Sequence, residues 1–193
     1  MSAGARTMNP LLKPAILGLA LLLAACRGDP VHYHTLVPAQ PASADVRTVD
    51  VRIEFLSVPP QVDRAQLVVR QGDSGLVVLE SEWWGSTLVD EVRSALSGLL
   101  NSNAAQVTGL RLEVQRFDSV PGQYALLEAR WRLRAISHDN AGPPLRCHSV
   151  IRSTAGASLP ELVAAQQRNL AQLAGVIART AAAGRVSCAA LAP

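Results

Sequence analysis

The chain has 193 residues, which suffices for one ordinary domain and is short for two. It carries 18 basic and 15 acidic side chains. Two of the basic ones, Arg6 and Lys13, lie in an N-terminal leader, so residues 26–193 hold 16 basic against 15 acidic groups. A nearly neutral domain lacks the excess positive charge by which proteins bind nucleic acid, so we expect no nucleic-acid partner.

Residues 1–25 predict a secretion signal that ends in a lipidation site. Arg6 and Lys13 precede an apolar run over 14–25, which is shorter than the roughly 20 residues that a membrane-spanning helix requires. The run closes with Leu23-Ala24-Ala25-Cys26, which resembles a lipobox, where small side chains precede a cysteine whose thiol accepts a diacylglyceryl group. We therefore expect a covalent lipid on Cys26. The alternative is an ordinary signal that a cysteine follows by chance.

The residues after Cys26 bear on where the protein is held. An aspartate directly after the lipidated cysteine resembles a signal for retention in the inner membrane. Arg27 stands there instead, so we expect the periplasmic face of the outer membrane. Acyl chains such as palmitate give lasting attachment, since each buried methylene contributes about 0.8 kcal/mol. Pro, Ala and Gln without periodicity follow, and we interpret residues 26–47 as the lipidated terminus and a tether.

Residues 48–193 predict a single folded domain of strands and helices. Val51, Ile53 and Phe55 alternate with polar residues, so we expect all three on one face of the first strand. A turn over 72–75 joins the second and third strands in a hairpin. The predicted strands cover residues 49–58, 65–70, 76–80, 110–116, 124–136 and 145–153.

Two helices are predicted from apolar stripes and from their caps. Ser86 or Thr87 caps the first, which reaches about Leu100. Ser158 begins the second with the spacing of a capping box, and Gly184 ends it. The order of strands, helix, strands and helix predicts an α/β domain of the α+β type. We expect a two-layer sandwich of a mostly antiparallel sheet covered by two helices.

Cys147 and Cys188 remain once Cys26 carries lipid. Because an exported protein folds in an oxidising compartment, an even pair of cysteines favours a disulfide between them. The bond would join the last strand to the tail beyond the final helix. Two unpaired thiols are the alternative.

No motif in the chain predicts catalysis or a metal site. Ser137-His138-Asp139 names the three parts of a hydrolase triad, but adjacent residues cannot converge as a triad does, so we interpret them as a solvated turn. His32 and His34 could share one side of an extended segment, yet a metal site needs three or four ligands. We expect no catalytic residue, no metal and no cofactor beyond the lipid.

Several side chains are candidates for contact with a partner. Trp84 is expected in the core and Trp83 on the opposite side, where tryptophan suits a protein contact or a bilayer interface. Asp63 and Arg64 begin a strand and suit either a local ion pair or a partner contact. Arg130, Arg132 and Arg134 share one strand face. That face is either solvated or meets acidic protein or lipid headgroups.

Four segments together resemble the ABC-type transport auxiliary lipoproteins, the family of PqiC-like proteins. They are Tyr33-His34-Thr35-Leu36, the stretch from Pro60 to Arg70 that contains Asp63-Arg64, Trp84-Gly-Ser-Thr-Leu88, and the strand from Leu110 that ends in Phe117. Each segment alone is weakly specific, but their order behind a lipobox makes the combination more specific. Thr87 stands where the family usually has proline.

The resemblance implies a non-catalytic outer-membrane subunit of an MCE-type lipid transport system. Its partners would be a periplasmic PqiB-like tunnel protein with an MCE domain and inner-membrane transporter components. The family's members are thought to form rings, so the resemblance also implies a ring-shaped homo-oligomer. The alternatives are a free-standing structural lipoprotein of the envelope and a lipid-binding or hydrolytic enzyme.

Overall fold

The computed structural model describes residues 29–39, 50–136 and 143–191. The leader with Cys26, and Ser137-His138-Asp139, lie outside the described residues. The chain divides into two units after Pro30, and every element described below belongs to the second, Val31–Pro193.

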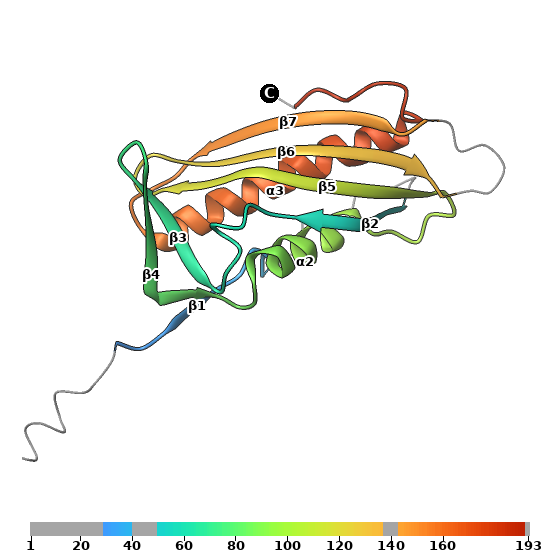
Figure 1. Cartoon of the computed structure of the whole chain (residues 1–193). Helices are drawn as coiled ribbons and strands as arrows, with labels where there is room; N and C mark the ends of the chain where they lie inside the picture. The colour runs from blue at the N-terminus through green and yellow to red at the C-terminus, as the bar shows by residue number, and fades with distance from the viewer. Residues whose placement is uncertain (1–28, 40–49, 137–142, 192–193) are drawn as a thin grey trace, which may run out of the picture. The chain divides into compact units, whose positions relative to one another are not determined.

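A four-stranded sheet in the order β2-β5-β6-β7 forms the larger part of the domain (Figure 1). β5 and β6 are its long central strands, and β2 pairs parallel to β5 while β6 pairs antiparallel to both β5 and β7. The strands cover β2 Asp50–Ser57, β5 Val107–Val120, β6 Tyr124–Ala135 and β7 Leu145–Thr154.

A second sheet of three strands, in the order β1-β4-β3, stands at one end of the first. The antiparallel pair β3 (Gln66–Gln71) and β4 (Gly75–Trp84) is the predicted hairpin, whose Gly72 has a φ of +63° in the turn. β1 (His32–His34) pairs parallel to β4 and comes from the segment interpreted as a tether. That interpretation was therefore wrong for residues 32–36. Three strand residues are too few to produce a readable alternation.

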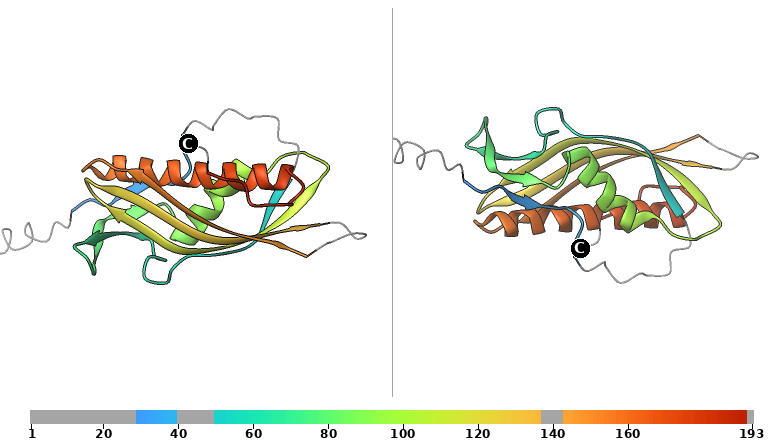
Figure 2. Two further views of the ribbon diagram at one scale, coloured as in Figure 1. Left: turned by 90° about the horizontal axis from the view of Figure 1, so that it is seen from above. Right: turned by 90° about the horizontal axis from the view of Figure 1, so that it is seen from below.

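Two helices cover the inner face of the four-stranded sheet. α3 (Leu159–Ala182) runs along the sheet, and α2 (Leu88–Leu100) lies against β2 and α3 (Figure 2). The capping box of Ser158 and Glu161 is present, and Gly184 follows the end of α3 with a φ of +72°. A positive φ strains most residues but not glycine, so this residue ends the helix as expected.

The core lies between these helices and the inward side chains of β5 and β6. Leu127, Ala129, Trp131 and Leu133 alternate inward along β6 and are at most 1% exposed. The indole N–H of Trp131 donates a hydrogen bond to Ser149 Oγ at 3.0 Å, so its one polar group is satisfied in the core. The α+β class, with a sheet packed against two helices, is confirmed; the strands form two mixed sheets rather than one.

The first strand departs from its predicted alternation. The register of β2 against β5 shifts between Ile53 and Phe55, which makes Glu54 the extra residue of a bulge. Beyond a bulge the side chains exchange faces. Leu56 is therefore buried, whereas Phe55 is 37% exposed and lies under the guanidinium of Arg111. The prediction that Phe55 shares the face of Val51 was wrong for this reason.

Candidate functional site

The N-terminal segment, residues 31–39, is bound to the domain by side chains as well as by β1. His34 Nε2 lies 2.6 Å and His32 Nδ1 3.2 Å from the two carboxylate oxygens of Glu82. The hydrogen bond with His34, the larger cause, and that with His32 lower the pKa of Glu82 below its usual value. Leu36 follows and is 1% exposed, so the segment enters the core at this residue.

Glu91, in the first turn of α2, holds the next residues of this segment. Its carboxylate accepts hydrogen bonds from Thr35 Oγ1 at 2.7 Å, from the backbone N–H of Leu36 at 2.8 Å and from Ser86 Oγ at 3.3 Å. From α3, the Gln167 amide donates to the carbonyl of Thr35 at 3.0 Å. A buried carboxylate is stable only when hydrogen-bonded in this way, and the early turn of a helix favours negative charge.

Asp63 completes the start of the same helix. Thr87 occupies the N-cap, but its side chain makes no capping hydrogen bond and donates instead to Asp90 Oδ2 at 2.8 Å. Asp63 Oδ1 accepts from the backbone N–H of Val89 at 3.3 Å. Asp63, in the segment before β3, therefore supplies the acceptor that an N-cap usually provides. Arg64 beside it is exposed.

Trp84 packs at the centre of this arrangement. It is 4% exposed and its ring meets that of Phe117 edge to face, with centroids 6.5 Å apart. The four segments on which the family resemblance rests therefore meet at one place: residues 33–36, Asp63, the entrance of α2 and the β5 residue Phe117. We call this the N-terminal junction. Sequence reasoning missed Glu91 as the residue that binds the N-terminal segment, because an acid in an early helical turn predicts only a dipole interaction.

Trp83 points to the face of β4 opposite that of Trp84, because successive side chains of a strand alternate and Trp84 points into the core. In the register of β1 and β4 it stands beside Tyr33, and the two rings meet edge to face with centroids 6.4 Å apart. The Trp83 indole N–H donates to the carbonyl of Glu80 at 2.8 Å. Trp83 is half-buried, whereas Tyr33 is 67% exposed.

Arginines gather on the outer face of the four-stranded sheet. Arg111, Arg132 and Arg146 lie directly opposite one another on β5, β6 and β7, in one row across the sheet. They line an open hollow of about 420 Å³ together with Arg130 and His148, and Glu113 is the acid among its lining residues. Like charges in direct register repel one another. We call this row and Arg130 the arginine face.

Arg134 differs from the other predicted arginines because its ion pair is close and two-pronged. Its guanidinium forms a two-pronged ion pair with Glu54, the bulge residue of β2, and this carboxylate raises the pKa of Arg134. The ion pair of Arg132 with Glu113 is longer, with 3.8 Å between the nearest nitrogen and oxygen atoms. Of the three arginines predicted as contacts, Arg130 and Arg132 therefore belong to the hollow, and Arg134 fastens β6 to β2.

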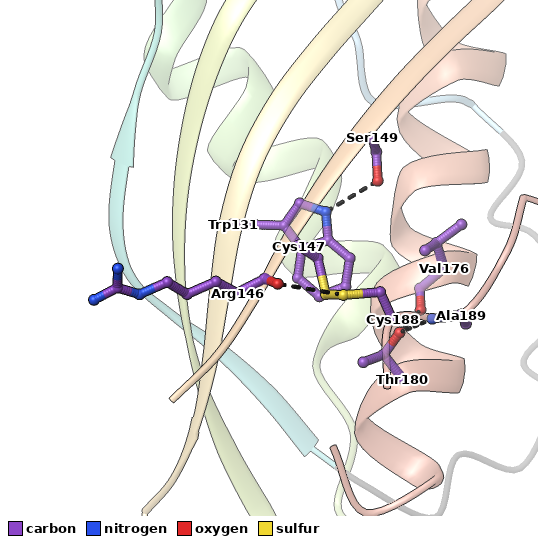
Figure 3. The surroundings of a disulfide bond; sticks show 8 residues. All are labelled: Trp131, Arg146, Cys147, Ser149, Val176, Thr180, Cys188 and Ala189. Atoms are coloured by element: carbon purple, nitrogen blue, oxygen red, sulfur yellow. Dashed lines mark hydrogen bonds between the residues drawn. A yellow bond between two sulfur atoms is a disulfide. The ribbon is translucent and has the colours of Figure 1, made fainter. Parts of the chain in front are cut away.

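Cys147 and Cys188 form a disulfide in the structure, with Cα atoms 5.8 Å apart (Figure 3). The bond joins β7 to the tail beyond α3. Next to it, Thr180 Oγ1 accepts from the backbone N–H of Ala189 at 3.0 Å and donates to the carbonyl of Val176 at 2.8 Å. Disulfide and hydrogen bonds together fix the C-terminal tail against the last turns of α3.

The described parts of the chain contain no group of three or more His, Cys, Asp or Glu side chains placed to hold a metal ion. His32 and His34 instead share the carboxylate of Glu82. None of the helices within the described ranges has both the length and the apolar character to cross a membrane. What the geometry presents is an α+β domain with a fastened N-terminus and a cationic face on its larger sheet.

Comparison with known proteins identifies the class. The chain belongs to the ABC-type transport auxiliary lipoprotein components, whose family model matches residues 34–178. None of the curated proteins matches its sequence.

Two crystal structures share the fold. An uncharacterized protein is 17% identical with a TM-score of 0.61, covering 79% of this chain and 99% of its own. A protein of Xanthomonas campestris is 19% identical with a TM-score of 0.57, covering 80% of this chain and 96% of its own.

Proposed function

We propose that the protein is a non-catalytic lipoprotein subunit of an MCE-type ABC system for lipid transport between membranes. In this proposal acyl chains on Cys26 hold the domain at the periplasmic face of the outer membrane. There the domain docks a PqiB-like tunnel protein, whose inner-membrane partners supply the ATP-driven step. A ring of identical subunits would suit the end of such a tunnel.

One observation carries the proposal: only five residues lie between the proposed lipidation site and the first strand of the fold. Only residues 27–31 separate Cys26 from His32, the first residue of β1. Six successive Cα–Cα steps of about 3.5 Å reach at most about 20 Å. Because the N-terminal junction fastens this segment to both helices, lipid on Cys26 would hold the whole domain against the bilayer and not at the end of a long tether.

The arginine face is the docking surface that we propose for the tunnel protein. Its aligned cations repel one another in the isolated domain, and an acidic surface on a partner would remove that repulsion. Arg111, Arg130 and Arg146 are exposed, so an acidic surface of a partner can reach them.

Co-purification from mild detergent extract tests this function. The wild-type protein should recover an MCE-domain protein, and Arg132→Glu should lower the recovery at least tenfold. This variant places a carboxylate between Arg111 and Arg146 and breaks the 3.8 Å ion pair of Arg132 with Glu113. An unchanged Tm shows that loss of the partner does not reflect unfolding. Arg64→Glu reverses an exposed charge elsewhere and should leave the recovery unchanged.

The outcomes separate the alternatives. Recovery of no MCE-domain protein by the wild type would favour a free-standing envelope lipoprotein. Turnover of phospholipid or ester substrates by the purified protein, abolished by a single Ser or His substitution, would favour an enzyme and contradict the proposal.

A further inference from the structure

The orientation of the domain at the membrane follows from β1 and β4. Their parallel register pairs His32 with Glu82 and Tyr33 with Trp83. Side chains alternate along a strand, so the two histidines turn toward the Glu82 carboxylate while the two aromatic rings share the opposite face. The hydrogen bonds of His32 and His34 to Glu82 fix this choice of faces.

The aromatic face is exposed next to the point where the chain leaves the domain. Tyr33 is 67% exposed and Val31, two residues closer to Cys26, is 40% exposed. The edge-to-face contact of Tyr33 with Trp83 makes one apolar surface of two rings from separate strands. Exposed aromatic and aliphatic side chains gathered at one place indicate a binding surface.

The short connection limits what can cover this surface. Six residues separate Tyr33 from Cys26, and seven Cα–Cα steps of about 3.5 Å keep the backbone of Tyr33 within about 25 Å of Cys26. That distance is comparable to half the thickness of a bilayer with its headgroups, about 20 Å. A surface held this close to a bilayer meets headgroups before it meets a soluble partner.

We propose that Tyr33, Trp83 and Val31 lie in the headgroup region of the bilayer that holds Cys26, as a second, non-covalent membrane contact. The inference rests on the lipidation in the proposed function. Tryptophan and tyrosine are the residues that prefer this interface, because a flat apolar ring carries one polar group. Here the Trp83 indole N–H already has a protein acceptor, Glu80, so its ring can enter the interface without an unsatisfied donor. The contact orients the domain with the β1–β4–β3 sheet toward the lipid.

Fluorescence quenching in vesicles tests the inference on the full-length lipoprotein. The protein is reconstituted into phosphatidylcholine vesicles whose acyl chains are brominated near the headgroup end. Trp84 and Trp131 are 4% and 1% exposed, so the difference between wild type and Trp83→Phe isolates the Trp83 signal. We expect the brominated lipid to reduce that signal at least twofold.

A lengthened tether provides the matched control. Ten Gly/Ser residues inserted after Arg27 keep the lipid and the fold but let the domain leave the surface. We expect lipid quenching of Trp83 to fall severalfold in this variant and quenching by aqueous iodide to rise. The iodide readout on wild type and insertion variant requires no tryptophan substitution, so the test does not depend on the folding of Trp83→Phe.

The two claims fail in different ways. Protein that floats with the vesicles but shows no quenching of Trp83 by the brominated lipid would overturn the membrane contact alone. Wild-type protein that does not float would overturn both the lipid attachment and the contact that rests on it.

Discussion

The backbone N–H of Leu36 donates a 2.8 Å hydrogen bond to the carboxylate of Glu91, although 55 residues separate them. This bond joins the N-terminal segment, which follows the proposed lipidation site at Cys26, to the first turn of α2. It means that a pull on the N-terminus is transmitted to the helical layer and not only to a three-residue strand.

Replacing Glu91 should destabilise the domain. Glu91→Ala removes the acceptor of three donors in a buried place, and hydrogen bonds to a charged group contribute about 1.5–3 kcal/mol each. Only the Leu36 N–H among these donors is fully buried, so we expect the free energy of unfolding in urea to fall by about 2–3 kcal/mol. Asp90→Ala, an exposed acid in the same turn, should change it by about 0.5 kcal/mol or less. Equal effects of the two substitutions would contradict the role of Glu91.

Replacing Asp63 should weaken the start of α2. Asp63→Ala leaves the Val89 N–H without its acceptor, and loss of a helix cap costs about 1 kcal/mol. Urea denaturation measures this, with Arg64→Ala as the neighbouring control, for which we expect little change. If Asp63→Ala unfolds at the same urea concentration as wild type, Asp63 does not cap the helix.

The disulfide should contribute a large part of the domain's free energy of unfolding. In the chain-entropy model, a bond that closes 41 residues stabilises by about 4 kcal/mol. The double variant Cys147→Ser/Cys188→Ser should therefore melt well below wild type, and a reducing agent should shift the wild-type Tm but not that of the variant. Two reactive thiols in denatured, unreduced wild-type protein would show that the bond is absent in the native protein.

Stability should also fall in acid through Glu82. Its pKa is lowered in the folded protein, chiefly by His34, so its contribution is present above the usual carboxyl value of 4.5 and is lost as the pH falls through the lower folded pKa. We expect the free energy of unfolding to decline more steeply below pH 4.5 in wild type than in Glu82→Gln. Parallel pH profiles for the two proteins would refute the linkage.

Local signals in the sequence predicted much of the fold. The capping box at Ser158, the glycine stop at Gly184 and the inward alternation of Leu127 to Leu133 all act between residues near in the chain, and each is confirmed.

The remaining features depend on contacts between distant residues. The bulge at Glu54 is fixed by pairing with β5 and by the ion pair to Arg134, so no pattern within residues 49–58 reveals it. Likewise β1 forms by pairing with β4 and through the hydrogen bonds of its histidines to Glu82. The row of Arg111, Arg132 and Arg146 can be recognised only when the register of three strands is known. For the candidate site, sequence reasoning named Arg130 and Arg132 but neither Arg111 nor Arg146.

The central claim is that lipid on Cys26 holds this domain at a membrane, and labelling tests it most directly. Cells expressing wild type or Cys26→Ser are grown with radiolabelled palmitate, and their membranes are fractionated. The account requires label on the wild-type protein, its recovery with the outer membrane, and neither for Cys26→Ser. Unlabelled wild-type protein that washes free of membranes would contradict it.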